Sequence, residues 1–124
     1  MKYKYFNISE FDCKSEPGTG IKVNPELIKK LDIAREYSNC VYKITSGYRS
    51  EKHTQYLIDK GYKTSMTSSH IKGLAADIEV KNSNHAMQIL SGLMFANFNR
   101  IGISKYFIHC DIDPNKPQNV LWTY

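Results

Sequence analysis

The chain has 124 residues, about the length of one ordinary domain, and we expect a single domain over residues 1–124. Hydrophobic residues make up 41% and aromatic residues 12%, which supports one hydrophobic core and argues against disorder. The formal charge of +5 favours an anionic partner such as a cell-wall polymer, nucleic acid or a membrane surface. Because the lysines are scattered, we interpret them as a solvated basic surface and expect no nucleic-acid partner.

The cysteines and the N-terminus bear on the compartment in which the protein is made. Cys13, Cys40 and Cys110 contain no CxxC pair, so buried thiols are the preferred interpretation, and a Cys13–Cys40 bridge stays open. The first residues lack the apolar region of a signal peptide, and no apolar run approaches the roughly 20 residues that span a bilayer. We therefore expect a soluble protein made in the cytoplasm, without membrane insertion, that needs another route to any site of action outside.

Capping residues and apolar spacing predict three helices, and β-rich runs predict the strands between and after them. The helices are expected at about 25–38, 51–60 and from 83 onward, with Asn24, Ser50 and Asn82 or Ser83 as N-caps. The strands are expected at 41–45, 74–80, 101–103, 106–112 and 120–124. Since helices precede and interrupt the strands, an α+β domain with a small, mainly antiparallel sheet fits best.

Three residues are candidate metal ligands. A tight turn at Gly73, followed by an alternating strand, can bring His70 and Asp77 together although they are seven positions apart. His109 lies on another predicted strand, on the same face as Asp111. If that face lies beside the face that carries Asp77, two imidazoles and one carboxylate converge, a set that suits Zn²⁺ and leaves a fourth position for water. Such a site favours hydrolysis of an amide, because the ion activates water and polarises a carbonyl.

The same residues belong to motifs that match a known family. The run Ser68-x-His70-x-x-Gly73-x-Ala75-x-Asp77, followed by His109-x-Asp111, resembles the D-alanyl-D-alanine metallopeptidase family. Ser46-Gly47-Tyr48-Arg49-Ser50 is similar to the family's segment upstream of the zinc motif, and Glu10-Phe11-Asp12-Cys13 to the opening of its small bacterial and phage members. Members are zinc enzymes that cut peptidoglycan stem peptides, and they share their fold with the zinc domain of hedgehog signalling proteins.

The resemblance implies roles for individual residues. It makes His70, Asp77 and His109 the zinc ligands, and Arg49 the residue that holds a substrate carboxylate, to which a planar bidentate donor is suited. Ser68 would hydrogen-bond near the metal, to the substrate or to the neighbourhood of His70. A salt bridge within the loop for Arg49, and a turn cap for Ser68, are the alternatives.

The general base is where this sequence departs from part of the family. Several members carry an acidic residue three positions before the last His, and here that position is Tyr106. Asp111 is the candidate left: it could take the proton from zinc-bound water, or it could orient the ligand imidazole. Glu79 is a weaker reserve. For Tyr106 we expect core packing rather than donation to an oxyanion.

The resemblance therefore implies zinc-dependent hydrolysis of an amide bond in peptidoglycan stem peptides, by a D,D-carboxypeptidase or an endopeptidase. We expect a monomer that acts on the bacterial cell wall, as a phage endolysin or another wall-lysing enzyme does. The alternative is a binding module of the same fold that keeps zinc and has lost catalysis, which the missing acid at Tyr106 favours. A basic nucleic-acid-binding protein has only the net charge in its favour.

Overall fold

The computed structural model describes residues 2–124, and its three α-helices begin at the predicted capping residues. They are α1 (Pro25–Ser38), α2 (Glu51–Asp59) and α3 (Ser83–Phe95), and two short 3-10 helices, η1 (Ile8–Phe11) and η2 (Thr19–Lys22), precede them. The side-chain oxygens of Asn24, Ser50 and Asn82 accept hydrogen bonds from the first turns of these α-helices. None of the helices in residues 2–124 has the length and apolar character needed to cross a membrane.

Five strands form one sheet in the order β1-β2-β4-β3-β5. They are β1 (Ile44–Ser46), β2 (Ala75–Glu79), β3 (Arg100–Ile103), β4 (Phe107–Asp111) and β5 (Val120–Thr123). The pairs β1–β2, β2–β4 and β3–β4 are antiparallel, whereas β3 and β5 are parallel. The predicted α+β architecture with a mainly antiparallel sheet is therefore confirmed.

The expected strand at 41–45 lies later, at Ile44–Ser46. Tyr42 does not pair in the sheet but is buried in the core, where its hydroxyl lies 3.3 Å from the carbonyl oxygen of Ile89 in α3 and accepts a hydrogen bond from Ser38 of α1. Burial raises the pKa of this phenol above its ordinary range, so the ring is a neutral packing element. Tyr42, in the first half of the expected strand, thus packs against the two helices instead of pairing in the sheet.

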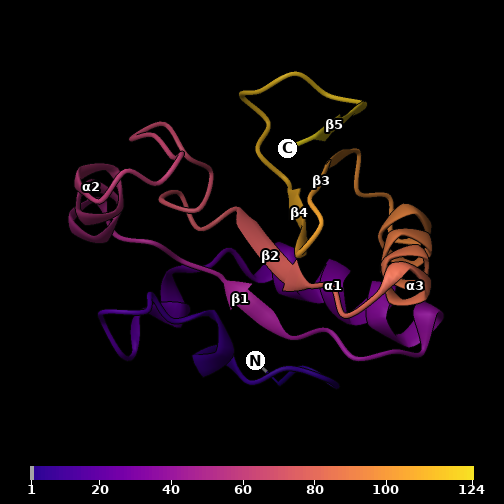
Figure 1. Ribbon diagram of the computed structural model, residues 1–124. Coiled ribbons are helices and arrows are strands. Elements are labelled where there is room, and N and C mark those ends of the chain that lie inside the picture. Colours follow the sequence, from indigo (N-terminus) through magenta and orange to yellow (C-terminus); the bar gives the residue numbers. More distant parts are fainter. Residues whose placement is uncertain (1) are drawn as a thin grey trace.

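One face of the sheet is covered by α1 and α3, which pack against each other (Figure 1). The core between sheet and helices contains Leu27, Ile28, Leu31 and Ala34 of α1, Ile89 and Leu93 of α3, and Ala76, Ile78, Ile108 and Cys110 of β2 and β4. Because side chains alternate along a strand, Asp77 and His109 lie on the opposite face. The helix α2 lies apart from this layer, on the left of Figure 1.

The three cysteines are free thiols, so the Cys13–Cys40 bridge that the sequence left open is not formed. Cys13 and Cys110 are buried, as expected, and Cys40 is half-buried. Burial raises the pKa of the Cys110 thiol well above its ordinary value. A buried, protonated thiol packs as a small apolar side chain and is no nucleophile.

The turn at Gly73 ties the segment before β2 to the start of α1. Gly73 has a φ of +72°, and its carbonyl accepts a hydrogen bond from the N–H of Asn24 at 2.8 Å. A Cβ at this position would lie 2.3 Å from the carbonyl oxygen of Lys22. Both the left-handed backbone and the close approach of a second segment therefore require glycine.

Replacing Gly73 with Ala should destabilise the protein in two ways. Left-handed backbone costs a residue with a side chain about 1–2 kcal/mol, and the clash with Lys22 should add about 1–3 kcal/mol. Gly61→Ala is the matched control, because Gly61 has a φ of +90° but nothing within 4 Å of the place of its Cβ. Urea unfolding should show the larger loss of stability for Gly73→Ala, and equal losses would contradict the steric argument.

Candidate metal centre

A row of paired residues crosses the sheet on the face away from α1 and α3. From β1 to β5 the row contains Ser46, Asp77, His109, Gly102 and Trp122, each opposite the next. Residues opposite each other on neighbouring strands have their side chains on the same face and within contact distance. The faces that carry Asp77 and His109 therefore lie side by side, which is the condition that the sequence left open.

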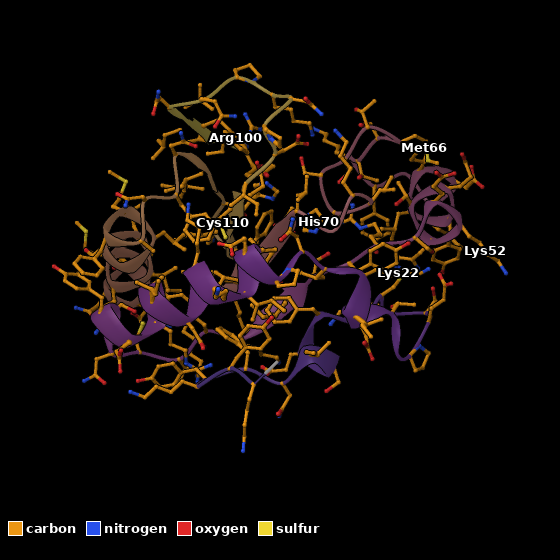
Figure 2. All side chains as sticks on the ribbon, turned by 180° about the vertical axis from the view of Figure 1, so that it is seen from behind. Lys22, Lys52, Met66, His70, Arg100 and Cys110 are labelled. Atoms are coloured by element: carbon orange, nitrogen blue, oxygen red, sulfur yellow. The ribbon has the colours of Figure 1, made fainter. Side chains whose placement is uncertain are left out.

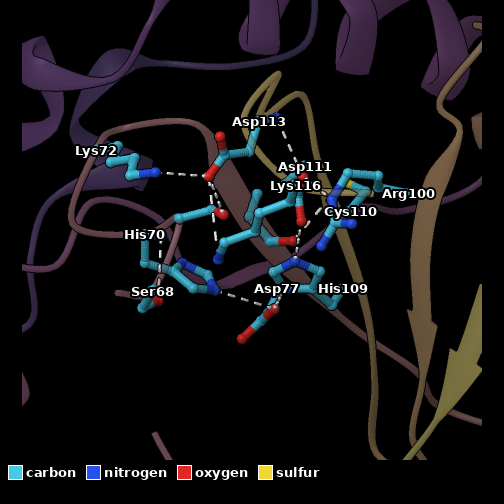
Figure 3. A network of polar contacts seen from close by, with 12 residues as sticks. Ser68, His70, Lys72, Asp77, Arg100, His109, Cys110, Asp111, Asp113 and Lys116 are labelled. Atoms are coloured by element: carbon cyan, nitrogen blue, oxygen red, sulfur yellow. Dashed lines mark hydrogen bonds and ion pairs between the residues drawn. The ribbon is translucent and has the colours of Figure 1, made fainter. Parts of the chain in front are cut away.

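His70, Asp77 and His109 converge at this row (Figure 3), and one ligand atom from each lies within 4.8 Å of the others. Nε2 of His70 lies 3.3 Å, and Nδ1 of His109 2.9 Å, from the same carboxylate oxygen, Oδ1 of Asp77. Ligand atoms bound at about 2.0–2.1 Å to a tetrahedral Zn²⁺ lie about 3.3 Å from one another. The spacing and the two-imidazole, one-carboxylate donor set therefore fit a zinc ion with an open fourth position.

The carbonyl of Gly47 holds the ring of His70. Nδ1 of His70 lies 2.8 Å from this carbonyl oxygen and donates to it, so Nε2 is the nitrogen that faces Asp77. The N–H of Arg49 donates to the carbonyl of His70 at 3.1 Å. Gly47 can occupy this position because it has no side chain: a Cβ would lie 2.6 Å from Cα of Phe11. The Ser-Gly-Tyr-Arg segment thus positions His70 through its backbone.

Asp111 holds the ring of His109 from the side opposite Asp77. Its Oδ2 accepts a hydrogen bond from Nε2 of His109 at 2.7 Å, and its Oδ1 accepts from Nε of Arg100 at 2.7 Å. Asp111 is only 1% exposed. With both oxygens engaged, the carboxylate directs Nδ1 of His109 towards Asp77. Of the two roles left open for Asp111, this geometry favours orientation of the imidazole over proton transfer.

The charges of this network stabilise ionised carboxylates. Burial raises the pKa of Asp77, but the charges of His70 and His109 and their hydrogen bonds outweigh burial and hold this pKa well below its usual range. Burial likewise raises the pKa of Asp111, and the hydrogen bonds from His109 and Arg100 bring it below the ordinary value. For His109 burial lowers the pKa, while Asp111 and Asp77 raise it overall. The centre therefore offers an anionic carboxylate between two imidazoles.

A cavity of about 250 Å³ opens over the three candidate ligands. Its other lining residues are Arg49, Leu57, Tyr62, Lys63, Thr64, Ser68, Phe107 and Tyr124. The walls thus come from the loop after α2, from the start of β4 and from the C-terminal end of the chain. Among the described residues, Asp77 is the one carboxylate that lines this cavity.

Arg49 lies in the cavity wall and forms no ion pair with a described residue. Its two terminal nitrogens donate to the hydroxyls of Thr64 at 2.9 Å and Ser46 at 3.2 Å, which orient the guanidinium without neutralising it. The salt bridge considered for Arg49 is therefore not formed. The hydroxyl of Ser68 accepts from the N–H of His70 at 3.2 Å, so Ser68 caps this turn and also lines the cavity.

The other residues weighed as proton carriers lie away from the cavity. Tyr106 is 70% exposed in the turn between β3 and β4, so the expectation that it packs in the core is wrong. The residue lies between the end of β3 at Ile103 and the start of β4 at Phe107, outside the alternating positions that face the core, and its ring stays in solvent. Glu79 lies at the far end of β2 and pairs with Lys43 at 3.8 Å.

Trp122 and Arg100 are part of this site although their positions in the sequence gave no indication of it. The ring centroid of Trp122 lies 5.5 Å from that of His109, and the guanidinium carbon of Arg100 lies 5.1 Å from the Trp122 ring. Gly102 makes room for the indole, since a Cβ there would lie 2.4 Å from Nε1 of Trp122. Trp122 therefore packs against the candidate metal centre.

A buried carboxylate beside the centre joins the turn before β2 to the end of β4 (Figure 3). Asp113 is fully buried, and its Oδ2 accepts hydrogen bonds from the hydroxyl of Ser69 at 2.7 Å and from Nζ of Lys72 at 3.1 Å. Its N–H donates to Oδ1 of Asp111 at 3.1 Å. The two segments that carry the candidate histidines are therefore held to each other by polar contacts.

Asp113→Ala should lower the free energy of unfolding by about 1–3 kcal/mol, because the buried hydroxyl of Ser69 loses its acceptor. Lys72→Ala is the control: it removes a half-exposed partner of the same carboxylate and should cost less than about 1 kcal/mol. Urea unfolding of the two variants measures the difference. A loss for Asp113→Ala no larger than that for Lys72→Ala would contradict the structural role of Asp113.

Comparisons with known proteins point to one family. The family model described as Peptidase M15 matches residues 4–111, a range that contains all three candidate ligands. Among solved structures, the crystal structure of the Serratia marcescens L-Ala D-Glu endopeptidase ChiX is similar, with a TM-score of 0.54 and 22% sequence identity. This similarity covers 61% of the present chain and 62% of that chain, and at this identity it shows a shared fold. No curated protein sequence matches the chain.

Proposed function

The chain belongs to the peptidase M15 family of metallopeptidases, and on this basis we propose that it hydrolyses an amide bond in peptidoglycan stem peptides with Zn²⁺ as its cofactor. One observation carries the proposal: the second nitrogen of each candidate imidazole ligand is held by an acceptor. Gly47 holds Nδ1 of His70, and Asp111 holds Nε2 of His109. Histidines that bind metals are oriented in this way. Two histidines that only packed in a core would not have to point their remaining nitrogens at the same oxygen, Oδ1 of Asp77.

The residues of the cavity have distinct parts in this proposal. His70, Asp77 and His109 would hold the ion, which when bound supplies a Lewis acid and lowers the pKa of a water molecule. Arg49 would bind a carboxylate of the substrate, since its guanidinium is oriented and lacks an ionic partner among the described residues. Ser68 would donate its hydroxyl hydrogen to the peptide beside the metal, because its oxygen already accepts from the turn.

Charge and the structural neighbour support a peptidoglycan substrate. The similar structure is that of an L-Ala D-Glu endopeptidase, and stem peptides of the cell wall carry free carboxylates. A chain with a formal charge of +5 attracts such anionic peptides. We therefore propose that the protein acts at the bacterial cell wall.

Digestion of purified peptidoglycan tests the proposal. The zinc-loaded protein should release peptides whose masses identify the scissile bond, chelation should abolish this release, and added Zn²⁺ should restore it. His70→Ala should lose the activity and bind zinc more weakly, because a metal ligand is removed. Tyr106→Phe is the matched control, since it removes an exposed hydroxyl outside the cavity and should keep full activity.

Release of peptides that survives chelation, or survives His70→Ala, would overturn the zinc mechanism. A protein that binds zinc and stem peptides tightly but releases no product would instead support the inactive binding module.

Asp111→Asn separates orientation of the ligand from proton transfer. The amide fills the same space but weakens the bond to Nε2 of His109, so zinc affinity should fall about 10–100-fold. At saturating zinc, kcat should then stay within about 10-fold of wild type, because the ion again occupies its site. If Asp111 were the general base, kcat at saturating zinc would fall about 10²–10⁴-fold while zinc affinity changed little. Competition with a chelator gives the affinity, and peptide release gives kcat.

A further inference from the structure

Two further cavities form a row with the cavity over the candidate metal centre, because neighbouring cavities share lining residues. A second cavity of about 200 Å³ shares Arg49 and Leu57 with it. A third, of about 450 Å³, shares Lys14 and His53 with the second. We name this row of three neighbouring cavities the extended groove; its lining runs from the candidate ligands past Arg49 to residues 14–16 and the start of α2.

Unpaired lysines line the extended groove. Lys14 and Lys52 border the third cavity, and Lys63 borders the cavity over the candidate ligands. All three are exposed and form no ion pair within residues 2–124. Figure 2 shows Lys52 projecting outward from α2, with His70 nearer the centre of the molecule. Ammonium groups without a protein partner attract anions into a cleft.

Asp12 and Glu16, the acidic residues that line the second and third cavities, form no ion pair with these lysines. The carboxylate of Asp12 accepts hydrogen bonds from the backbone N–H groups of Gly18 at 2.9 Å and Gly20 at 2.7 Å, and so serves the fold of its own loop. Glu16 borders the third cavity, and its Oε2 is buried without a hydrogen-bond partner in the described chain.

The second and third cavities of the extended groove also offer apolar surface. The rings of His53 and Tyr56 are stacked, with centroids 5.8 Å apart and an interplanar angle of 25°, and Tyr56 is 53% exposed. Leu57 lies in the wall between the first two cavities. Peptide sites combine such apolar faces with a few charged groups that fix the ligand's orientation. The lining therefore suits an extended peptide with several carboxylates.

From the shared lining residues and the unpaired lysines we infer that the extended groove binds the part of an acidic peptide that lies beyond the scissile amide, with Lys14 and Lys52 as carboxylate-binding residues. The inference rests on the proposed function, in which the cavity over the candidate ligands holds the scissile amide. Arg49, which lines both this cavity and the second one, would then hold the nearest carboxylate of the peptide. Such an enzyme prefers stem peptides whose carboxylates are free over peptides of equal length whose carboxylates are amidated.

Two peptides of equal length test this inference: one with free carboxylates outside the scissile pair, and one with those carboxylates amidated. For the wild type, kcat/KM should be about 10-fold higher for the acidic peptide, mainly through KM. The double variant Lys14→Gln/Lys52→Gln should reduce this preference to about 2-fold or less. The double variant Lys2→Gln/Lys81→Gln removes the same charge from exposed positions outside the groove and should keep the preference.

Binding is measured separately, by NMR titration of the wild type with a chelator present to stop turnover. The acidic peptide should shift the backbone amide signals of Lys14 and Lys52 in a saturable way, and the amidated peptide should not. If both peptides are cut equally well and these signals do not move, the inference is wrong while the proposed function stands. If the zinc-loaded protein cuts neither peptide, the proposed function fails, and the titration alone decides whether the groove binds acidic peptides.

Discussion

The pairing of Asp77 with His109 across β2 and β4 is the contact on which the candidate metal centre depends. The two strands pair without interruption over five residues, and the same register places Ile108 and Cys110 against the helices. A slip of one residue would turn these apolar side chains to the other face and push His109 under α1 and α3. The hydrophobic core therefore sets the register, and the register brings the candidate ligands Asp77 and His109 together.

The face opposite the core carries charges whose burial costs free energy. Arg100, Asp111 and His109 form a chain of hydrogen bonds that ends at Asp77, and its inner members are almost fully buried. Each link pairs a donor with an acceptor, and Trp122 covers the guanidinium of Arg100 with its ring. This chain of hydrogen bonds fixes the direction of the His109 imidazole. The apolar face of the sheet contributes the stability that offsets the cost of burying these charges.

Features with a local signal could be predicted from the sequence, and features that depend on register could not. The helix cap at Asn24 and the glycine turn before β2 are local, and the face of His109 follows from alternation along one strand. Alternation also predicts that Asp111 lies on the same face as His109, but it does not indicate which ring nitrogen of His109 Asp111 contacts. Arg100 and Trp122 reach the candidate site because β3 pairs with both β4 and β5. These three strands share no sequence motif, so the sequence does not indicate that the two residues lie there.

The candidate metal ligands and the lysines of the extended groove come from different parts of the chain. The candidate ligands lie on paired strands and on a turn anchored by Gly73, where packing leaves little freedom. The helix α2 buries only Thr54, contributes nothing to the layer of α1 and α3, and so leaves Lys52 and Tyr56 on a free surface. Side chains on such a surface can change without disturbing the core that sets the strand register. A chain of this size can therefore keep a rigid candidate metal centre while the side chains along α2 vary, which would let the proposed peptide groove change without loss of the fold.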